Sequence, residues 1–229
     1  RPGGAAAPDT QKKQRTQTSG KTTEPGSTRL VATLGLAGLL SGLIIDAVFE
    51  ATLPTSTAYK AKVLQEAVFR VLPGTSRLQR LAYREGRLTA VDEVTPDEES
   101  IFGGYDTNGK LVGYAIPGAG PGFQDIIRLL YGYLPEQRRV VGMEVLASRE
   151  TPGLGDKIYK DAEFVASFAA LSIDPRIVAV KQGRKAAANE IDAITGATIS
   201  SKAVVRIINQ AHERWQRRLE RPDATRPAD

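Results

Sequence analysis

The longest hydrophobic run of the chain lies near its N-terminal end. Residues 30–49 contain one ionisable side chain, Asp46, and residues 30–45 contain none. As a helix this run would span about 30 Å, which is enough to cross a bilayer. A cleaved signal peptide is the alternative, but the polar stretch before the run is long and no clear Ala-x-Ala site follows it. We therefore predict a transmembrane helix at residues 30–49, preceded by a disordered basic tail at residues 1–29 that has little to bury.

The pattern after residue 50 is that of a folded α+β domain. Apolar residues recur at helical spacing over 63–72, where Pro73-Gly74 ends the helix, and helical patterns return over 161–170 and from Ser200 or Ser201 onward. Short β-type runs separated by turn residues lie between them. The expected strands are 78–84, 87–91, 100–105, 110–116, 126–134, 139–147 and 176–181. We predict a largely antiparallel sheet packed by helices over residues 50–212, then a basic C-terminal tail at 213–229.

Composition narrows the chemistry that this domain can perform. The chain has no cysteine and one histidine, His212, which excludes disulfides, thiolate-ligated clusters and zinc–thiolate sites. No residue stands out as a catalytic acid, base or nucleophile, and no metal site is expected. Any redox chemistry must come from an organic cofactor. The net charge of +5 is modest and its basic residues lie mostly at the two ends, so nucleic-acid binding is not expected.

The most informative segment lies just before the last helical pattern. It reads Asp192-Ala-Ile-Thr195-Gly196-Ala197-Thr198 and continues into the polar start of a helix. Gly196 and Ala197 leave room for a bulky group beside the Thr198 hydroxyl. A helix N-terminus favours anions, so a phosphate at Thr198 would be well placed. A capped turn that enters a helix is the ordinary alternative.

This segment resembles the Asp-x-x-Ser/Thr-Gly-Ala-Thr flavinylation motif of the FMN-binding domain family. The motif occurs in the G subunit of Rnf electron-transport complexes and in the related C subunit of the sodium-pumping NADH:quinone oxidoreductase. The resemblance implies one FMN joined covalently to Thr198 through a phosphoester. A separate flavin transferase would form that bond with FAD as donor. Asp192, Thr195, Gly196 and Ala197 would form the recognition and phosphate loop.

A second segment, Glu150-Thr151-Pro152-Gly153-Leu154-Gly155, resembles the Glu-Thr-Pro-Gly-Leu-Gly loop of the same subunits. In that family the loop lies against the flavin, which implies ring-facing roles for Glu150, Thr151, Gly153, Leu154 and Gly155. An ordinary Pro-Gly turn is the alternative for this segment alone. A weaker match at Gly122-Phe123 makes Phe123 a candidate to wall the flavin, although a core position is an equal alternative. Where many relatives carry histidine before the loop, this chain has Ser148-Arg149.

These resemblances imply a membrane-anchored electron-transfer subunit of an ion-coupled complex, with other membrane subunits and a flavin transferase as partners. Basic residues are denser before the hydrophobic run than after it. The positive-inside rule therefore predicts a single-pass protein of the bacterial inner membrane, with a cytoplasmic N-terminus and the FMN domain outside. Three alternatives remain open: the same module in another respiratory or photosynthetic complex, a flavin-domain sensor or regulator, and a flavin-dependent reductase that works with a partner.

Overall fold

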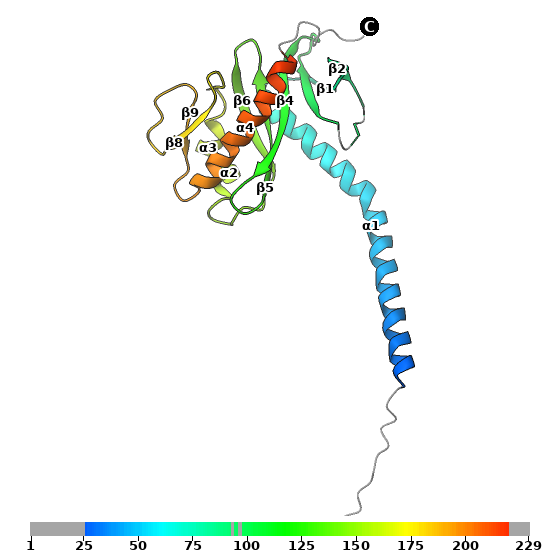
Figure 1. Cartoon of the computed structure of the whole chain (residues 1–229). Coiled ribbons are helices and arrows are strands. Elements are labelled where there is room, and N and C mark those ends of the chain that lie inside the picture. The colour runs from blue at the N-terminus through cyan, green and yellow to red at the C-terminus, as the bar shows by residue number, and fades with distance from the viewer. Residues whose placement is uncertain (1–25, 93, 96–97, 220–229) are drawn as a thin grey trace, which may run out of the picture. The chain divides into compact units, whose positions relative to one another are not determined.

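A computed structural model describes residues 26–92, 94, 95 and 98–219, and for residues 51–61 of the first helix it describes the backbone alone. Figure 1 shows the arrangement of the elements. The helices are α1 (Ser27–Val71), α2 (Lys157–Lys160), α3 (Ala162–Ala166) and α4 (Thr198–Leu219). The strands are β1 (Arg77–Arg84), β2 (Arg87–Ala90), β3 (Ser100–Tyr105), β4 (Leu111–Pro121), β5 (Ile126–Leu134), β6 (Arg139–Ala147), β7 (Leu171–Ser172), β8 (Val178–Lys181) and β9 (Glu190–Ala193).

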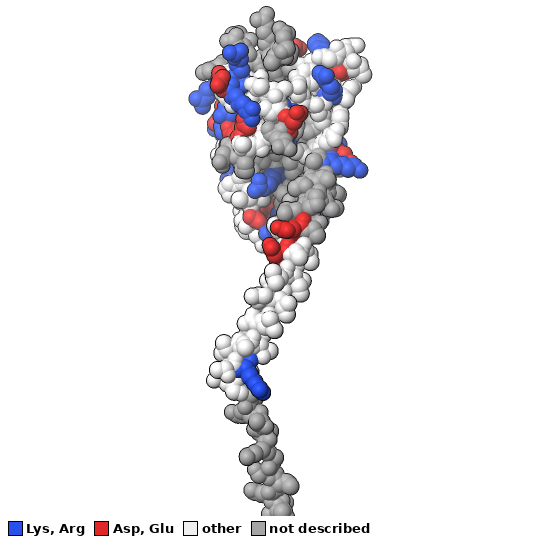
Figure 2. All heavy atoms as spheres, turned by 90° about the vertical axis from the view of Figure 1, so that its right-hand side faces the viewer, with Lys and Arg blue, Asp and Glu red and all other residues white. Residues whose placement is uncertain are grey.

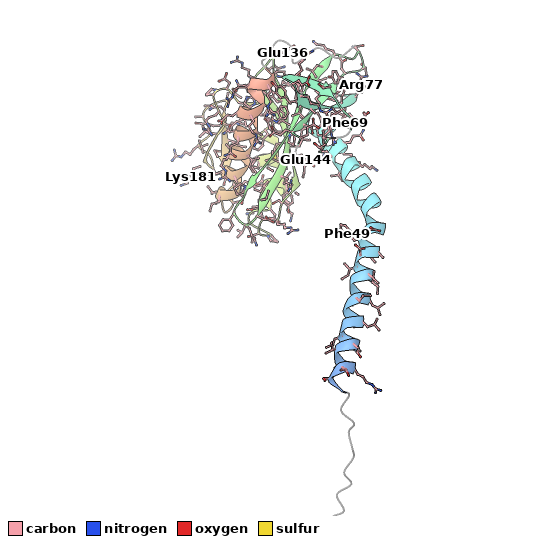
Figure 3. The ribbon with its side chains drawn as sticks, turned by 45° about the vertical axis from the view of Figure 1, so that its right-hand side comes forward. Phe49, Phe69, Arg77, Glu136, Glu144 and Lys181 are labelled. Atoms are coloured by element: carbon pink, nitrogen blue, oxygen red, sulfur yellow. The ribbon has the colours of Figure 1, made fainter. Side chains whose placement is uncertain are left out.

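The predicted hydrophobic helix is the first part of α1. Its segment Ser27–Glu50 is 24 residues long with a mean hydropathy of 2.0, so its length and composition suit a membrane span. Figure 2 shows a largely uncharged surface along this part of the helix, and Phe49, labelled in Figure 3, is 62% exposed there. The chain divides into two compact units after Pro54. Residues 27–29 of the expected N-terminal tail are part of α1, whereas residues 1–25 of that tail and residues 220–229 of the expected C-terminal tail lie outside the described residues.

The predicted antiparallel sheet is confirmed. Seven strands pair in the order β2-β1-β3-β4-β5-β6-β7, and every neighbouring pair is antiparallel. The long strands β4 and β5 form its centre, in a register that pairs Tyr114 with Tyr133 and Pro121 with Ile126. Their far ends therefore lie side by side and lead into the loop at residues 122–125.

Two apolar clusters cover the two faces of this sheet. The larger cluster lies under α4, which buries Val204, Ile207 and Trp215. The smaller cluster lies under the last turns of α1, where Val71 and the next residue, Leu72, are buried. Backbone packs on backbone there, because a Cβ at Gly132 would lie 1.9 Å from the Val71 carbonyl oxygen. The sheet thus has an apolar core on each of its two faces.

The sequence pattern missed two features that position the site. Strand β9, only four residues long, directly precedes the Thr195-Gly196 turn and pairs in parallel with β8. Helix α4 starts at Thr198, earlier than expected, and runs to Leu219, so residues 213–219 of the expected tail are helical. The helix expected over 161–170 is shorter and is preceded by α2. A strand of four residues that enters a motif rich in small residues carries too little periodicity to be read.

Candidate cofactor site

The Thr195–Thr198 segment forms a tight turn between β9 and α4. Gly196 has a φ of +84°, a conformation that favours glycine. The turn is closed from inside by Ser201, whose hydroxyl donates to the Ala197 carbonyl at 2.9 Å and accepts from the Ile194 N–H at 3.1 Å. Ser201 is fully buried. It therefore fixes the backbone on which Thr198 stands.

Thr198 is the first residue of α4 and its side chain is exposed. Its hydroxyl reaches only the Ile194 carbonyl, at a long 3.4 Å, so it is not committed to the protein interior. Among the described residues, no acceptor serves the N–H groups of Thr198, Ile199 and Ser200. Such N–H groups at the start of a helix attract a negatively charged ligand. The position combines a free hydroxyl with an anion-attracting backbone.

The carboxylate of Glu150 joins three segments that are distant in sequence. Its Oε1 accepts from the N–H groups of Phe123 at 2.9 Å and Gln124 at 3.0 Å. Its Oε2 accepts from the hydroxyl of Ser200, in the first turn of α4. The Glu150 side chain is buried, with 5% of its surface exposed. The loop before β5, the Glu150–Gly155 loop and the start of α4 are therefore held around one carboxylate.

These hydrogen bonds keep Glu150 ionised although it is buried. Burial raises the pKa of the carboxyl, but the bonds from Ser200 and from the backbone of residues 123–125 outweigh it, so the pKa lies below its ordinary value. A buried carboxylate with its oxygens engaged in this way is a positioning group. Sequence reasoning placed Glu150 in the ring-facing loop. In the structure its side chain points into the protein and orders that loop from behind.

Three large apolar side chains are left exposed around this carboxylate. Phe123 is 64% exposed, Leu154 50% and Ile199 58%. Their backbones are tied together through Glu150 and its hydrogen bonds. A Cβ at Gly196 would lie 3.8 Å from the Leu154 side chain, so the two predicted loops meet at this point. Phe123 is exposed, so it is not a core residue.

The rest of the Glu150–Gly155 loop fits this close assembly. Thr151 lies at the surface, where its hydroxyl bonds to the Gln124 side chain at 2.9 Å. Gly153 is exposed with a φ of +77°. A Cβ at Gly155 would lie 2.7 Å from the Glu150 Oε2 and 3.0 Å from the Ser200 Oγ. Only glycine at position 155 allows the loop to approach both α4 and the carboxylate.

Asp192 and Thr195 organise the other side of Thr198. One oxygen of Asp192 accepts from the N–H groups of Arg184 and Lys185, both at 3.1 Å, and so orders the loop after β8. The Thr195 hydroxyl contacts the side chain of Gln182 in the same loop. The structure thus brings the two predicted loops together, with Leu154 beside Gly196 and Glu150 beside Ser200. Sequence reasoning missed Gln182, Ser200 and Ser201, whose only signal was their proximity to the motif or to β8.

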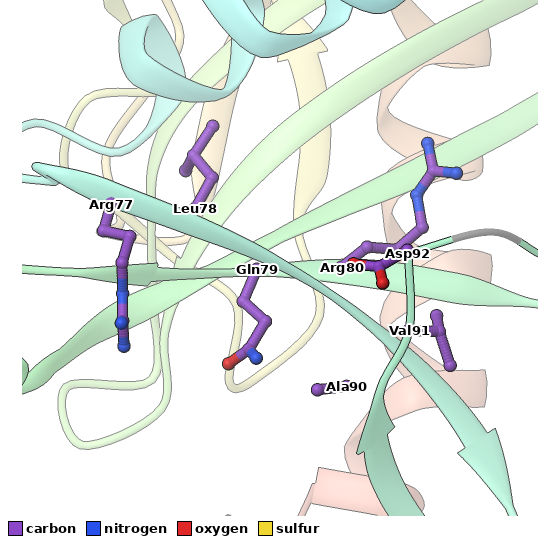
Figure 4. A pocket seen from close by; sticks show the side chains of 7 residues that line it. All are labelled: Arg77, Leu78, Gln79, Arg80, Ala90, Val91 and Asp92. Carbon is purple, nitrogen blue, oxygen red and sulfur yellow. The ribbon is translucent and has the colours of Figure 1, made fainter.

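A hollow of about 240 Å³ opens beside Thr198, between the end of β8 and the start of α4. Its lining residues are Ala179, Val180, Lys181, Gln182, Ala193, Thr195, Thr198 and Lys202. A second hollow, of about 340 Å³, lies on the β1–β2 hairpin at the opposite side of the domain and includes Arg77 and Asp92 (Figure 4). None of the predicted site residues lines that second hollow. Of the predicted site residues, Thr195 and Thr198 line the hollow between β8 and α4.

The surroundings of Thr198 differ in character on its two sides. The hollow on one side carries two lysines and no carboxylate among its lining residues. On the other side the half-exposed side chain of Leu154 lies near Gly196. Together with the free helix N–H groups, this arrangement suits a ligand that has a phosphate at one end and a flat apolar ring at the other. The fold and site define a domain for a phosphorylated aromatic cofactor.

Comparison with known proteins agrees with this class. Residues 122–213 match the family described as FMN-binding domain. The G subunit of the Na(+)-translocating ferredoxin:NAD(+) oxidoreductase complex of Acetobacterium woodii is 30% identical over 172 residues, covering 73% of this chain and 77% of that protein. The G subunit of the ion-translocating oxidoreductase complex of Methanosarcina acetivorans is 27% identical, covering 80% of this chain and 92% of that protein.

Solved structures share the fold. NqrC from Shewanella oneidensis aligns with a TM-score of 0.52 at 19% identity, over 66% of this chain and 91% of that one. The C subunit of the Na(+)-translocating NADH-quinone reductase from Parabacteroides distasonis aligns with a TM-score of 0.56 at 17% identity, over 73% of this chain and 97% of that one. The chain belongs to the FMN-binding domain family, in the group formed by the G subunits of ion-translocating oxidoreductase complexes. The predicted cofactor, FMN, is confirmed by that membership.

Proposed function

We propose that this protein is the electron-transferring G subunit of an ion-translocating membrane complex and that it carries one FMN on Thr198 through a phosphoester. The observation that carries the proposal is the place of Thr198. Its exposed hydroxyl lies between a lysine-containing hollow and an exposed apolar surface, at the start of a helix. FMN accepts and releases one or two electrons, which is the chemistry that an electron relay needs.

Each part of the site has a distinct task in this proposal. Thr198 provides the attachment oxygen, and the free N–H groups of the first turn of α4 receive the phosphate charge. Phe123, Leu154 and Ile199 offer apolar surface to the ring and exclude water from it. Glu150 contacts no ligand and holds the loops that carry those side chains.

Attachment requires a partner enzyme, because the described residues provide no base for the Thr198 hydroxyl: its one contact is a carbonyl oxygen. A flavin transferase that uses FAD would provide the base. The Thr198 oxygen forms a bond to phosphorus and loses its proton, the pyrophosphate bond of FAD breaks, and AMP leaves. Thr195, Gly196 and Thr198 are all exposed, so the turn leaves room for the transferase.

The membrane arrangement follows from the apolar part of α1. Ser27–Glu50 anchors the protein in the bacterial inner membrane, with the N-terminus in the cytoplasm and the FMN domain outside. A covalent bond is useful there, because a cofactor lost outside the cytoplasm is not readily replaced. Other subunits of the complex supply and remove the electrons.

The proposal is tested by expressing the full chain with and without a flavin transferase and viewing a denaturing gel under ultraviolet light. We expect a fluorescent band only with the transferase, and one FMN at the Thr198 peptide by mass spectrometry. Thr198→Ser should keep the label because it keeps a hydroxyl, whereas Thr198→Val should lose it. A label that persists in Thr198→Val, or no label in wild type with an active transferase, would refute the phosphoester.

A further inference from the structure

The hollow beside Thr198 is lined by two positively charged side chains, and the formation of the phosphoester does not by itself need them. Lys181 comes from the end of β8 and Lys202 from the first turns of α4, so lysines from two separate elements line the same hollow. Neither lysine forms an ion pair with any described residue. Lys202 follows Thr198 by four residues, which puts the two on one face of the helix. Lys181 lies at the outer edge of the domain in Figure 3.

The carboxylates nearest in sequence do not neutralise these lysines through hydrogen bonds. Asp192 accepts from the backbone of Arg184 and Lys185, and Glu190 accepts from the N–H groups of Ala186 and Ala187 at 2.7 and 3.1 Å. Both carboxylates are therefore bound to the backbone of the 184–187 loop. Neither is among the residues that line the hollow.

The walls of the hollow are built to hold their shape. Lys181 pairs in register with Ala193 across the parallel β8–β9 ladder. The next residue, Gln182, contacts the Thr195 hydroxyl across the mouth of the turn. Ser201 fixes the same turn from inside. The backbones of both lysines are thus held in place beside Thr198 before any ligand arrives, which reduces the entropic cost of binding.

We propose that Lys181 and Lys202 form a phosphate subsite that binds the phosphate of a flavin mononucleotide reversibly and independently of the bond to Thr198. The inference rests on the proposed function in so far as FMN is the cofactor. It adds that the chain itself recognises the phosphate and distinguishes phosphorylated flavin from riboflavin.

The test uses the full-length Thr198→Val chain in detergent, which lacks the attachment oxygen. Binding of FMN and of riboflavin is measured by the change in flavin fluorescence, at low and high salt. We expect FMN to bind at least about tenfold more tightly than riboflavin, since two cations contact its phosphate. Raising the salt should weaken FMN binding and leave riboflavin binding unchanged. Inorganic phosphate should displace FMN and not riboflavin.

Lysine variants of the Thr198→Val chain test whether the preference for FMN over riboflavin comes from these two residues. Lys181→Met and Lys202→Met should each weaken FMN binding by about three- to tenfold, because an exposed ion pair contributes modestly, and should leave riboflavin binding unchanged. Lys185→Met is the matched control, since Lys185 lies in the neighbouring loop outside the hollow. It should leave both affinities unchanged.

The outcomes separate this inference from the proposed function. Three results would each overturn the subsite. The first is equal affinity for FMN and riboflavin, and the second is a preference for FMN that neither lysine change reduces. The third is the absence of flavin binding by Thr198→Val. Covalent labelling of the wild-type chain would stand in all three cases. Conversely, a wild-type chain that is never labelled, with the FMN preference intact in Thr198→Val, would refute the phosphoester and support the subsite.

Discussion

The buried carboxylate of Glu150 gives the most direct test of how the site is held together. Glu150→Ala removes acceptors from two backbone N–H groups and from the Ser200 hydroxyl. Hydrogen bonds to a charged group contribute about 1.5–3 kcal/mol each, but the N–H groups of the exposed 123–124 turn regain water. We therefore expect a loss of about 2–4 kcal/mol in the free energy of unfolding. Glu150→Gln keeps one carbonyl oxygen, so its expected loss is about 1 kcal/mol.

The assay is urea unfolding of the detergent-solubilised chain, followed by the fluorescence of Trp215. This is the single tryptophan of the sequence, and it lies on the buried face of α4. For a domain of this size each kcal/mol also lowers the melting temperature by about 2–4 °C. Glu136→Ala, which changes an exposed glutamate in the β5–β6 turn (Figure 3), is the control and should change neither value by much.

The pH dependence provides a second readout on the same residue. Because the pKa of Glu150 is lower in the folded protein than its ordinary value, its stabilising contribution is complete above the ordinary value and is lost as the pH falls through the folded one. Wild type should lose stability over that acid range, and Glu150→Gln should lose less. The reasoning is refuted if Glu150→Ala unfolds at the same urea concentration as wild type, or if Glu150→Gln retains the full acid slope.

Three further predictions concern the loops and the membrane. Gly155→Ala should disturb the Glu150–Ser200 contact and reduce flavin labelling several-fold. The added methyl group of Gly153→Ala meets open space, so this variant should lower the free energy of unfolding by only about 1 kcal/mol through backbone strain. Equal labelling of the two variants would contradict this prediction. Asp192→Asn keeps an acceptor oxygen for the 184–185 backbone and should label better than Asp192→Ala, while equal loss in both would point to a need for the charge. The chain has no cysteine, so Gln137→Cys introduces a single thiol. A membrane-impermeant maleimide should label this thiol in intact spheroplasts. Labelling that occurs only after lysis would reverse the proposed orientation.

The antiparallel sheet was predictable because its strands are long and are separated by strong turn signals. Strands β5 and β6 begin and end where the sequence pattern placed them. Strand β4 continues beyond the expected residue 116 through Pro117 to Pro121. Proline lacks an N–H, so sequence reasoning ends a strand there. The structure keeps it because β5 pairs with this stretch and α4 packs over it.

The sequence predicted which loops form the candidate site, but not how their side chains are directed. The structure brings the two motif loops together, with Leu154 of one beside Gly196 of the other. The motif position of Glu150 gave no sign that its side chain turns inward. That direction depends on Ser200, fifty residues later, and no local pattern encodes a partner at such a distance. Lys181 was missed for a related reason, since it reaches the site only through the pairing of β8 with β9.

The contacts of Glu150 also explain why the two motifs belong together. The second loop approaches α4 only because position 155 lacks a side chain, and the first turn of α4 supplies the hydroxyl that engages the carboxylate. A chain with the Thr198 motif alone would have an attachment oxygen and no ordered apolar surface beside it. A chain with the Glu150 loop alone would bury a carboxylate that lacks one of its three donors, which is costly. The proposed attachment oxygen and the proposed ring surface are therefore one structural unit, and a change that loosens either loop should weaken both.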